Sequence, residues 1–167
     1  MTTTRRFAIL SQGVVAGAAG GVAEIVWVTL FAGVTGGNPA VLARGVTTAA
    51  GVSALLPASP IALGVAVHMM LAVSLGIALC FAWSALRDCR PGLTDPYPFM
   101  LVALAGVWAI NFFVVLPIVS PAFVHMVPYA VSLTSKLLFG VAAAEALRRQ
   151  TQSMSNVAQV LARKRSD

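Results

Sequence analysis

Residues 7–34 read FAILSQGVVAGAAGGVAEIVWVTLFAGV, and this stretch decides the fold class of the chain. A helix that crosses a membrane needs about 20 predominantly apolar residues, and the stretch exceeds that length. Its apolarity is continuous and does not alternate from residue to residue, which disfavours a strand of a membrane β-barrel. Because backbone groups in lipid must find their hydrogen-bond partners within the chain, the stretch is predicted to be a transmembrane α-helix.

Three further stretches have the same length and apolarity. The predicted fold class is therefore an all-α integral membrane protein with four transmembrane helices in a bundle. Of the 167 residues, 59% are apolar and 10% are charged, which excludes an ordinary water-soluble enzyme and a disordered chain. Residues 1–148 are expected to form a single transmembrane domain, followed by a basic cytoplasmic tail over residues 149–167. The further spans are predicted at about 61–86, 98–119 and 123–147.

The Lys and Arg residues outside the predicted spans lie almost entirely on one side of the membrane. Nine lie on that side, and Arg44 alone lies on the other. Cytoplasmic loops carry an excess of Lys and Arg, so both termini are predicted to be cytoplasmic. The same rule explains the net charge of +6 without a nucleic acid as partner. The nine residues are Arg5, Arg6, Arg87, Arg90, Arg148, Arg149, Arg163, Lys164 and Arg165.

The connection between the first two spans is predicted to contain a short amphipathic helix over residues 39–56, in the outer interface of the membrane. Asn38 is a typical N-cap, Pro39 suits the first helical position, and Pro57 is expected to close the helix. Two roles are open for this helix. It either caps the bundle or forms a lid over a cavity.

The tail carries Met154 and Val157 in a thin apolar stripe and ends in basic residues from Arg163 onward. Two structures are open for it. It either continues the last span as a helix on the inner leaflet, with its basic residues near anionic lipid, or is disordered after about Ser155.

The first span has a face of small residues. Gly13, Gly17 and Gly21 follow one another at intervals of four residues, and such spacing lets helices approach closely in lipid. This face is predicted to pack against another helix. That helix belongs either to the same chain, or to a protein partner or a second copy of the chain.

Each span contains one strongly polar residue, and counting from the outer ends places all four about 10–20 Å below the outer surface. A charged side chain at mid-membrane costs at least about 2.5–3.5 kcal/mol, so these residues should face the interior and find partners. We expect Glu24 and Lys136 to pair directly or through a neighbour, with Ser132, Thr134 and Ser135 adding hydroxyl groups. The buried polar layer consists of Glu24, His68, Asn111 and Lys136.

Two roles are open for this layer. It is either a structural clasp that fixes how the helices meet, or a small polar site, open to the outer face, for an ion, a proton or a small ligand. In the second case His68 would titrate, because the ordinary pKa of imidazole is closest to neutrality.

No catalytic motif, metal site or cofactor is predicted from the sequence. A b-type haem held by His68 and His125 is the least favoured hypothesis, because the two histidines are predicted to lie at different depths. The leading hypothesis is a non-enzymatic membrane subunit or accessory protein that packs against a larger membrane complex. The alternative is a small carrier of ions, protons or small solutes that uses the polar layer.

Several short motifs are similar to those of a known family. They are Gly13-Val-Val-Ala-Gly17, Asn38-Pro39, Gly64-Val-Ala-Val-His68, Ser74-Leu-Gly76 and Leu138-Phe-Gly140. Over most of residues 7–148 the chain resembles small four-helix bacterial inner-membrane proteins of the uncharacterised YagU-like type. The resemblance implies a four-helix fold in a bacterial inner membrane and no particular activity. It also implies a histidine shortly before the aromatic-Gly pair, where this sequence has Lys136.

Overall fold

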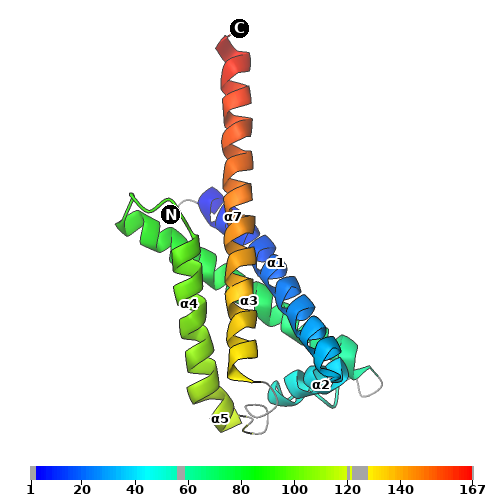
Figure 1. Ribbon diagram of the computed structural model, residues 1–167. Coiled ribbons are helices and arrows are strands. Elements are labelled where there is room, and N and C mark those ends of the chain that lie inside the picture. Colours follow the sequence, from blue (N-terminus) through cyan, green and yellow to red (C-terminus); the bar gives the residue numbers. More distant parts are fainter. Residues whose placement is uncertain (1–2, 56–58, 120, 122–127, 167) are drawn as a thin grey trace.

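The computed structural model describes residues 3–55, 59–119, 121 and 128–166, and every regular element in that part of the chain is a helix (Figure 1). Four helical segments are long and apolar enough to cross a membrane, which confirms the predicted all-α class with four long apolar helices. The elements are α1 (Thr3–Thr35), α2 (Pro39–Ala49), α3 (Pro60–Cys89), α4 (Tyr97–Ile110), the π-helical turn η1 (Asn111–Val115), α5 (Leu116–Val119) and α7 (Tyr129–Ser166).

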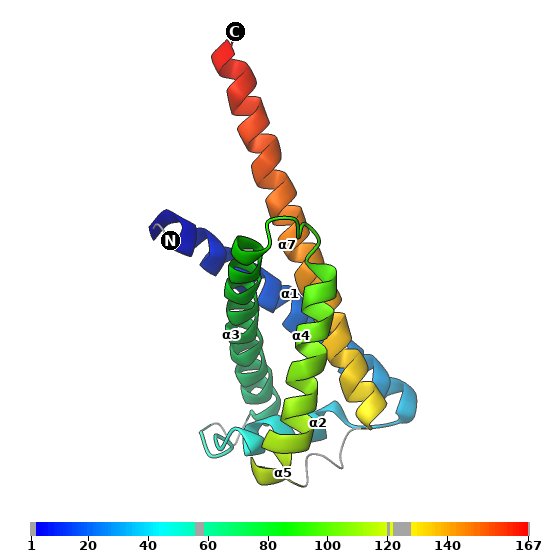
Figure 2. The same cartoon turned by 90° about the vertical axis from the view of Figure 1, so that its left-hand side faces the viewer.

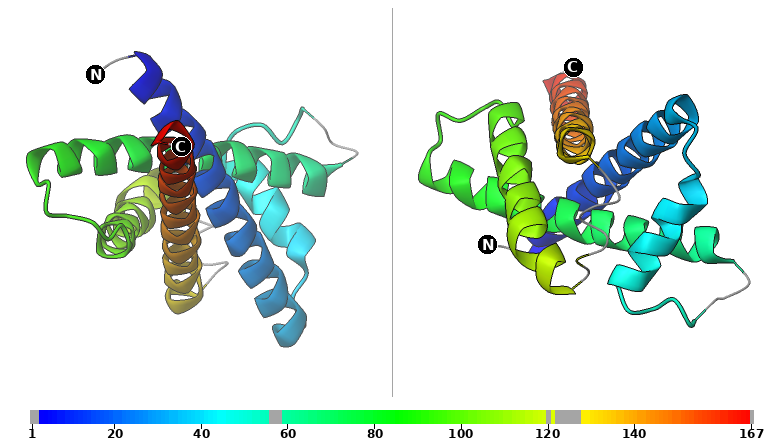
Figure 3. Two further views of the ribbon diagram at one scale, coloured as in Figure 1. Left: turned by 90° about the horizontal axis from the view of Figure 1, so that it is seen from above. Right: turned by 60° about the horizontal axis from the view of Figure 1, so that its bottom comes forward.

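The long helices alternate in direction along the chain. The chain therefore begins near the end of the molecule where α3 ends and α4 begins, and α2 and α5 lie at the opposite end (Figures 1 and 2). Seen from above, α1 and α3 cross one another instead of running side by side (Figure 3). α1 packs against both α3 and α7, whereas α4 packs mainly against α7. α1 and α7 are thus the two inner helices, each in close contact with two of the other three.

The crossing of α1 and α3 is built on glycines. A Cβ atom on Gly17 would lie 2.5 Å from the carbonyl oxygen of Ala72, and one on Gly76 would lie 2.4 Å from the Cα of Gly17. On Gly13, a Cβ would lie 2.5 Å from the Cα of Ile77. Only glycine permits such an approach of two backbones, and close approach is the main source of packing energy between helices in lipid. The sequence left open whether the glycine face packs against a helix of the same chain or of another chain. In the structure it packs against α3 of the same chain.

The expectation that a protein partner or a second copy binds through Gly13, Gly17 and Gly21 therefore needs correction. All three lie against α3, since a Cβ on Gly21 would come within 2.8 Å of the Cβ of Ala72. A face that α3 already fills has no room for another helix.

Polar contacts join the helices at the end of the molecule where the chain begins. The Arg5 Nη2 lies 2.6 Å from Asp88 Oδ1 and donates a second hydrogen bond to Ser84 Oγ at 2.9 Å, which links α1 to α3. The Tyr97 hydroxyl donates to Glu145 Oε2 at 2.7 Å, which links α4 to α7. The N-terminal segment and the end of α3 therefore meet at one end, as the distribution of basic residues predicts.

The last span differs from its predicted bounds at both ends. α7 begins at Tyr129, after Pro128, whose carbonyl accepts the first hydrogen bonds of the helix. Residues 122–127, including the predicted start of the span at 123 and His125, lie outside the described residues. At its other end α7 continues to Ser166 instead of stopping near residue 147. Of the two predictions for the tail, the structure has the helical continuation.

The helix between the first two spans begins where the sequence predicts and ends earlier. Asn38 is its N-cap, because the side-chain oxygen accepts a hydrogen bond from the backbone N–H of Ala40 at 2.9 Å. The predicted end at residue 56 is wrong, since α2 ends at Ala49. Gly51 follows with φ +69°, a left-handed conformation that helical residues do not adopt. The glycine, and not Pro57, therefore ends the helix.

Loss of this cap is expected to loosen α2. An Asn38→Ala variant removes the acceptor for the Ala40 amide and should lower the local stability of the helix by about 1 kcal/mol. Hydrogen–deuterium exchange of residues 40–49 measures this as faster exchange. Asn156→Ala, an exposed substitution within α7, is the matched control. Unchanged exchange in the Asn38 variant would show that the cap contributes nothing.

Candidate functional site

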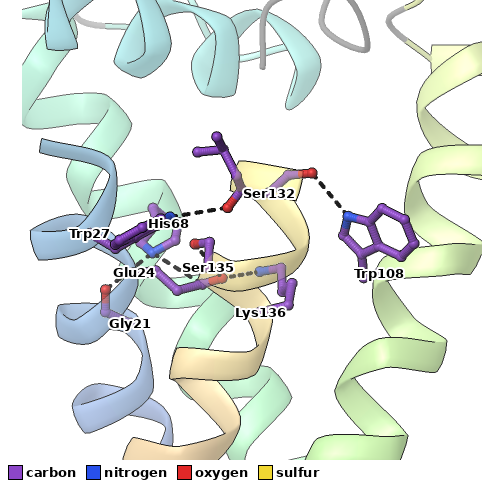
Figure 4. Close-up of polar contacts among 9 residues, drawn as sticks. Gly21, Glu24, Trp27, His68, Trp108, Ser132, Ser135 and Lys136 are labelled. Atoms are coloured by element: carbon purple, nitrogen blue, oxygen red, sulfur yellow. Dashed lines mark hydrogen bonds and ion pairs between the residues drawn. The ribbon is translucent and has the colours of Figure 1, made fainter. Parts of the chain in front are cut away.

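A buried ion pair lies where α1, α3 and α7 meet (Figure 4). The side chain of Glu24, on α1, is 4% exposed, and the Nζ of Lys136, on α7, lies 2.7 Å from its Oε1. The hydroxyl of Ser135 donates to the same oxygen at 3.2 Å. The pairing of Glu24 with Lys136 that the sequence predicts is therefore present. Their opposite charges compensate one another in an apolar surrounding, where a single charge would be costly.

His68, on α3, lies on the other side of the carboxylate. Its Nε2 is 3.6 Å from Glu24 Oε2 and 3.4 Å from the carbonyl oxygen of Gly21. Both of these atoms are acceptors when Glu24 is ionised, so the favourable tautomer of the imidazole carries its hydrogen on Nε2. At 3.6 Å the contact with the carboxylate is longer than a hydrogen bond. Glu24 Oε2 is therefore the less firmly held of the two carboxylate oxygens.

The glycine face of α1 positions Glu24. The residue follows Gly17 by seven positions and Gly21 by three, so one helical face carries all three. On α3, His68 precedes Ala72 by four positions, and Ala72 is the residue against which Gly17 and Gly21 pack. The glycines that bring α1 and α3 together thus also bring their polar side chains together. The spacing on α1, which is visible in the sequence, places Glu24 on the glycine face, and the structure shows that this face meets α3.

Two tryptophans bind α7 near the ion pair. The indole of Trp27 donates to the carbonyl oxygen of Val131 at 3.0 Å, and that of Trp108 donates to Ser132 Oγ at 3.0 Å (Figure 4). Reasoning from the sequence missed both. For Trp27 a signal was present, because it follows Glu24 by three positions and lies on the same face of α1. Trp108 offered no such signal, since its partner on α7 depends on how α4 packs.

Asn111 does not join the other three members of the predicted polar layer, which corrects that prediction. Within the described residues, its side chain makes no hydrogen bond with Glu24, His68 or Lys136, and its backbone carbonyl accepts from Leu116 in the π-helical turn η1. The physical reason is the packing of the helices. α4 packs mainly against α7, so equal depth along the spans does not place Asn111 beside the carboxylate.

The second histidine of the haem hypothesis, His125, lies outside the described residues. Among those that the structure describes, no group of three His, Cys, Asp or Glu side chains could hold a metal ion. His68 and Glu24 form a pair without a third ligand. The haem hypothesis stays untested, because His125 is not among the described residues.

The two basic side chains of the site are partly exposed. The side chains of His68 and Lys136 are 25% and 23% exposed, whereas that of Glu24 is buried. The ammonium group also lies 5.9 Å from the ring centroid of Phe139, a distance at which a ring face attracts a cation. Chemically, the arrangement can hold helices together, and it can exchange a proton at the imidazole.

Comparison of the chain with family models, with curated proteins and with solved structures found no match. The resemblance to YagU-like proteins therefore stays a prediction. Fold and site together define a class: an all-helical protein with four helices apolar enough to cross a membrane and one ion pair buried among three of them.

Proposed function

We propose that the chain is a multi-pass protein of a bacterial inner membrane, with both termini in the cytoplasm, and that it serves as a non-enzymatic subunit or accessory protein of a larger membrane complex. Large apolar side chains are exposed on every one of the four long helices, among them Leu30, Leu71, Val102 and Val141. A water-soluble monomer rarely exposes so much contiguous apolar surface. Lipid contact on these faces accounts for it.

The C-terminal extension, residues 151–166, is the observation that carries the accessory role. This part of α7 projects beyond the other helices (Figures 1 and 2). Its residues 151–156 are all exposed, while Leu147, one turn earlier, is buried in the core. Most helical stability in proteins comes from packing, so a projecting segment of this kind gains most from contact with a partner. The extension, and not the glycine face, is the proposed binding surface.

The polar site is consistent with this role, because the opposite charges of Glu24 and Lys136 pair with each other within the chain. Lys136 and Ser135 both bind Oε1 of Glu24, and the two helices involved pack closely. In the accessory role the ion pair is a structural clasp between α1 and α7. The ion pair holds α1 and α7 in alignment, and the projecting end of α7 contacts the partner.

Purification in a mild detergent tests the accessory role. The full chain should co-purify with a stoichiometric membrane protein, and a chain that ends at Gln150 should lose that protein. Thermal unfolding of the shortened chain in detergent is the control, and its midpoint should match that of the full chain because Leu147 and the core are kept. A full chain that purifies alone and monodisperse would overturn the proposal.

A second candidate function is a small carrier of protons or other ions. The observation that favours it is the partial exposure of His68 and Lys136 beside the buried carboxylate of Glu24. Proteoliposomes with a pH-sensitive dye inside test this function. A carrier would move protons down an imposed gradient, Glu24→Gln would abolish the movement, and Arg149→Gln would leave it unchanged. Rates equal to those of empty liposomes would contradict the carrier function.

A further inference from the structure

A shallow groove lies between the first turns of α1 and the second half of α3. Its volume is about 220 Å³, and its walls come from Thr3, Arg6, Phe7 and Leu10 of α1 and from Phe81 of α3. Pockets for drug-sized ligands are larger, at about 300–1,000 Å³. A narrow, flexible and apolar ligand fits a groove of this size and lining better than a compact polar one.

Arg6 gives the groove a charged edge. Long basic side chains cover apolar surface with their stems while the charged head reaches toward water. In the part of the chain that the structure describes, Arg6 makes no ion pair, whereas the neighbouring Arg5 is held by Asp88 at 2.6 Å. The guanidinium of Arg6 is therefore available for an anion from outside the protein.

We propose that this groove binds one anionic phospholipid, with an acyl chain against Phe7, Leu10 and Phe81 and the phosphate at Arg6. The inference rests on the proposed membrane location and is independent of any protein partner. The apolar lining of the groove suits the acyl chain of such a lipid, and the cation of Arg6 suits its anionic head group. Arginine suits the head group, because its planar fork of N–H donors binds phosphate oxygens in pairs.

The position of the groove also fits a lipid of the inner leaflet. It lies at the end of the molecule that carries Arg5, Arg87 and Arg90, which is the cytoplasmic end in the proposed orientation. The surface of that leaflet is negative and attracts basic residues near it. Attraction to a negative surface acts on all the basic residues alike. Binding in the groove instead predicts a preference for anionic lipid that depends on Arg6.

Nanodiscs made from equal parts of phosphatidylglycerol and phosphatidylcholine test the site. Native mass spectrometry of the released protein counts the lipids that stay bound. Both lipids carry a phosphate, but the choline cation of phosphatidylcholine neutralises its head group, so the wild-type chain should retain phosphatidylglycerol in preference. Arg6→Gln removes the cation that meets the net negative charge and should lower that preference about tenfold, the size of one charge-assisted contact. Arg90→Gln is the matched control, since Arg90 is exposed at the same end and does not line the groove.

A second pair of variants tests the acyl chain. Phe7→Ala removes part of the apolar wall and should reduce retention of both lipids, while Leu30→Ala, an equally exposed apolar position at the other end of α1, should not. Equal losses in Arg6→Gln and Arg90→Gln would overturn the site, as would full retention in Phe7→Ala. A chain that enters nanodiscs and shows no lipid preference contradicts the lipid site alone. A chain that does not enter them contradicts the membrane location as well.

Discussion

A Gly17→Ala variant is expected to lose about 1–3 kcal/mol of stability, the range for overpacking of a close contact. The added Cβ would lie 2.5 Å from the carbonyl oxygen of Ala72 and 2.7 Å from the Cα of Val73. Both are backbone atoms of α3, so no side chain can rotate to make room. The two helices must separate, and the ion pair two turns further along α1 is strained with them.

Gly33→Ala is the matched control. Gly33 lies in the same helix, and a Cβ there would meet no atom within 4 Å. Alanine favours a helix over glycine by about 1 kcal/mol, so this variant should be as stable as the wild type or more so. Unfolding of both variants in detergent, followed by circular dichroism against temperature, measures the difference. Equal midpoints for the two variants would contradict the close crossing of α1 and α3.

The second large effect concerns the buried ion pair. Lys136→Met is expected to cost about 3–5 kcal/mol, because it leaves the carboxylate of Glu24 without a counter-ion at a position where its side chain is 4% exposed. Glu24→Gln should cost less, since the side chain of Lys136 is 23% exposed and its ammonium group can extend toward water. The two variants are expected to differ in stability because Glu24 is more buried than Lys136, and not because of the strength of the ion pair, which both variants remove.

The double variant Glu24→Gln/Lys136→Met completes the cycle. With both charges gone no ion is stranded, so the double variant should be more stable than Lys136→Met alone. The exposed pair of Arg5 and Asp88, with side chains 42% and 50% exposed, is the reference, and its coupling should be much weaker because solvent screens exposed charges. A double variant no more stable than Lys136→Met would show that the two residues do not act as a pair.

Local patterns predicted much of this molecule. Continuous apolar runs predicted four long helices, because a run of that length has few other ways to satisfy its backbone in lipid. Asn38 and Pro39 predicted the start of α2, since a cap acts within three residues of itself. The end of α2 was missed, although Gly51 was available as a signal. Its left-handed conformation stops the helix at once, whereas Pro57 lies too far along to do so.

The polar layer could be predicted from the sequence only in part. Depth along a span can be counted from the sequence, and this brought Glu24, His68 and Lys136 to one level, where the structure joins them. Asn111 was counted at the same level and lies apart, because depth does not say which helix is the neighbour. That depends on side-chain packing between helices, which a single helical sequence does not contain.

By itself, the sequence determined the helical class, the number of long apolar helices and the shared level of Glu24, His68 and Lys136 along their helices, because each follows from composition and rise along one helix. Only the tertiary structure decided that α1 and α7 are the inner helices, that the glycines of α1 meet α3 within the same chain, and that the end of α7 projects alone. The physical reason is that contacts between helices in lipid depend on how closely their surfaces fit. That fit is a property of two faces together.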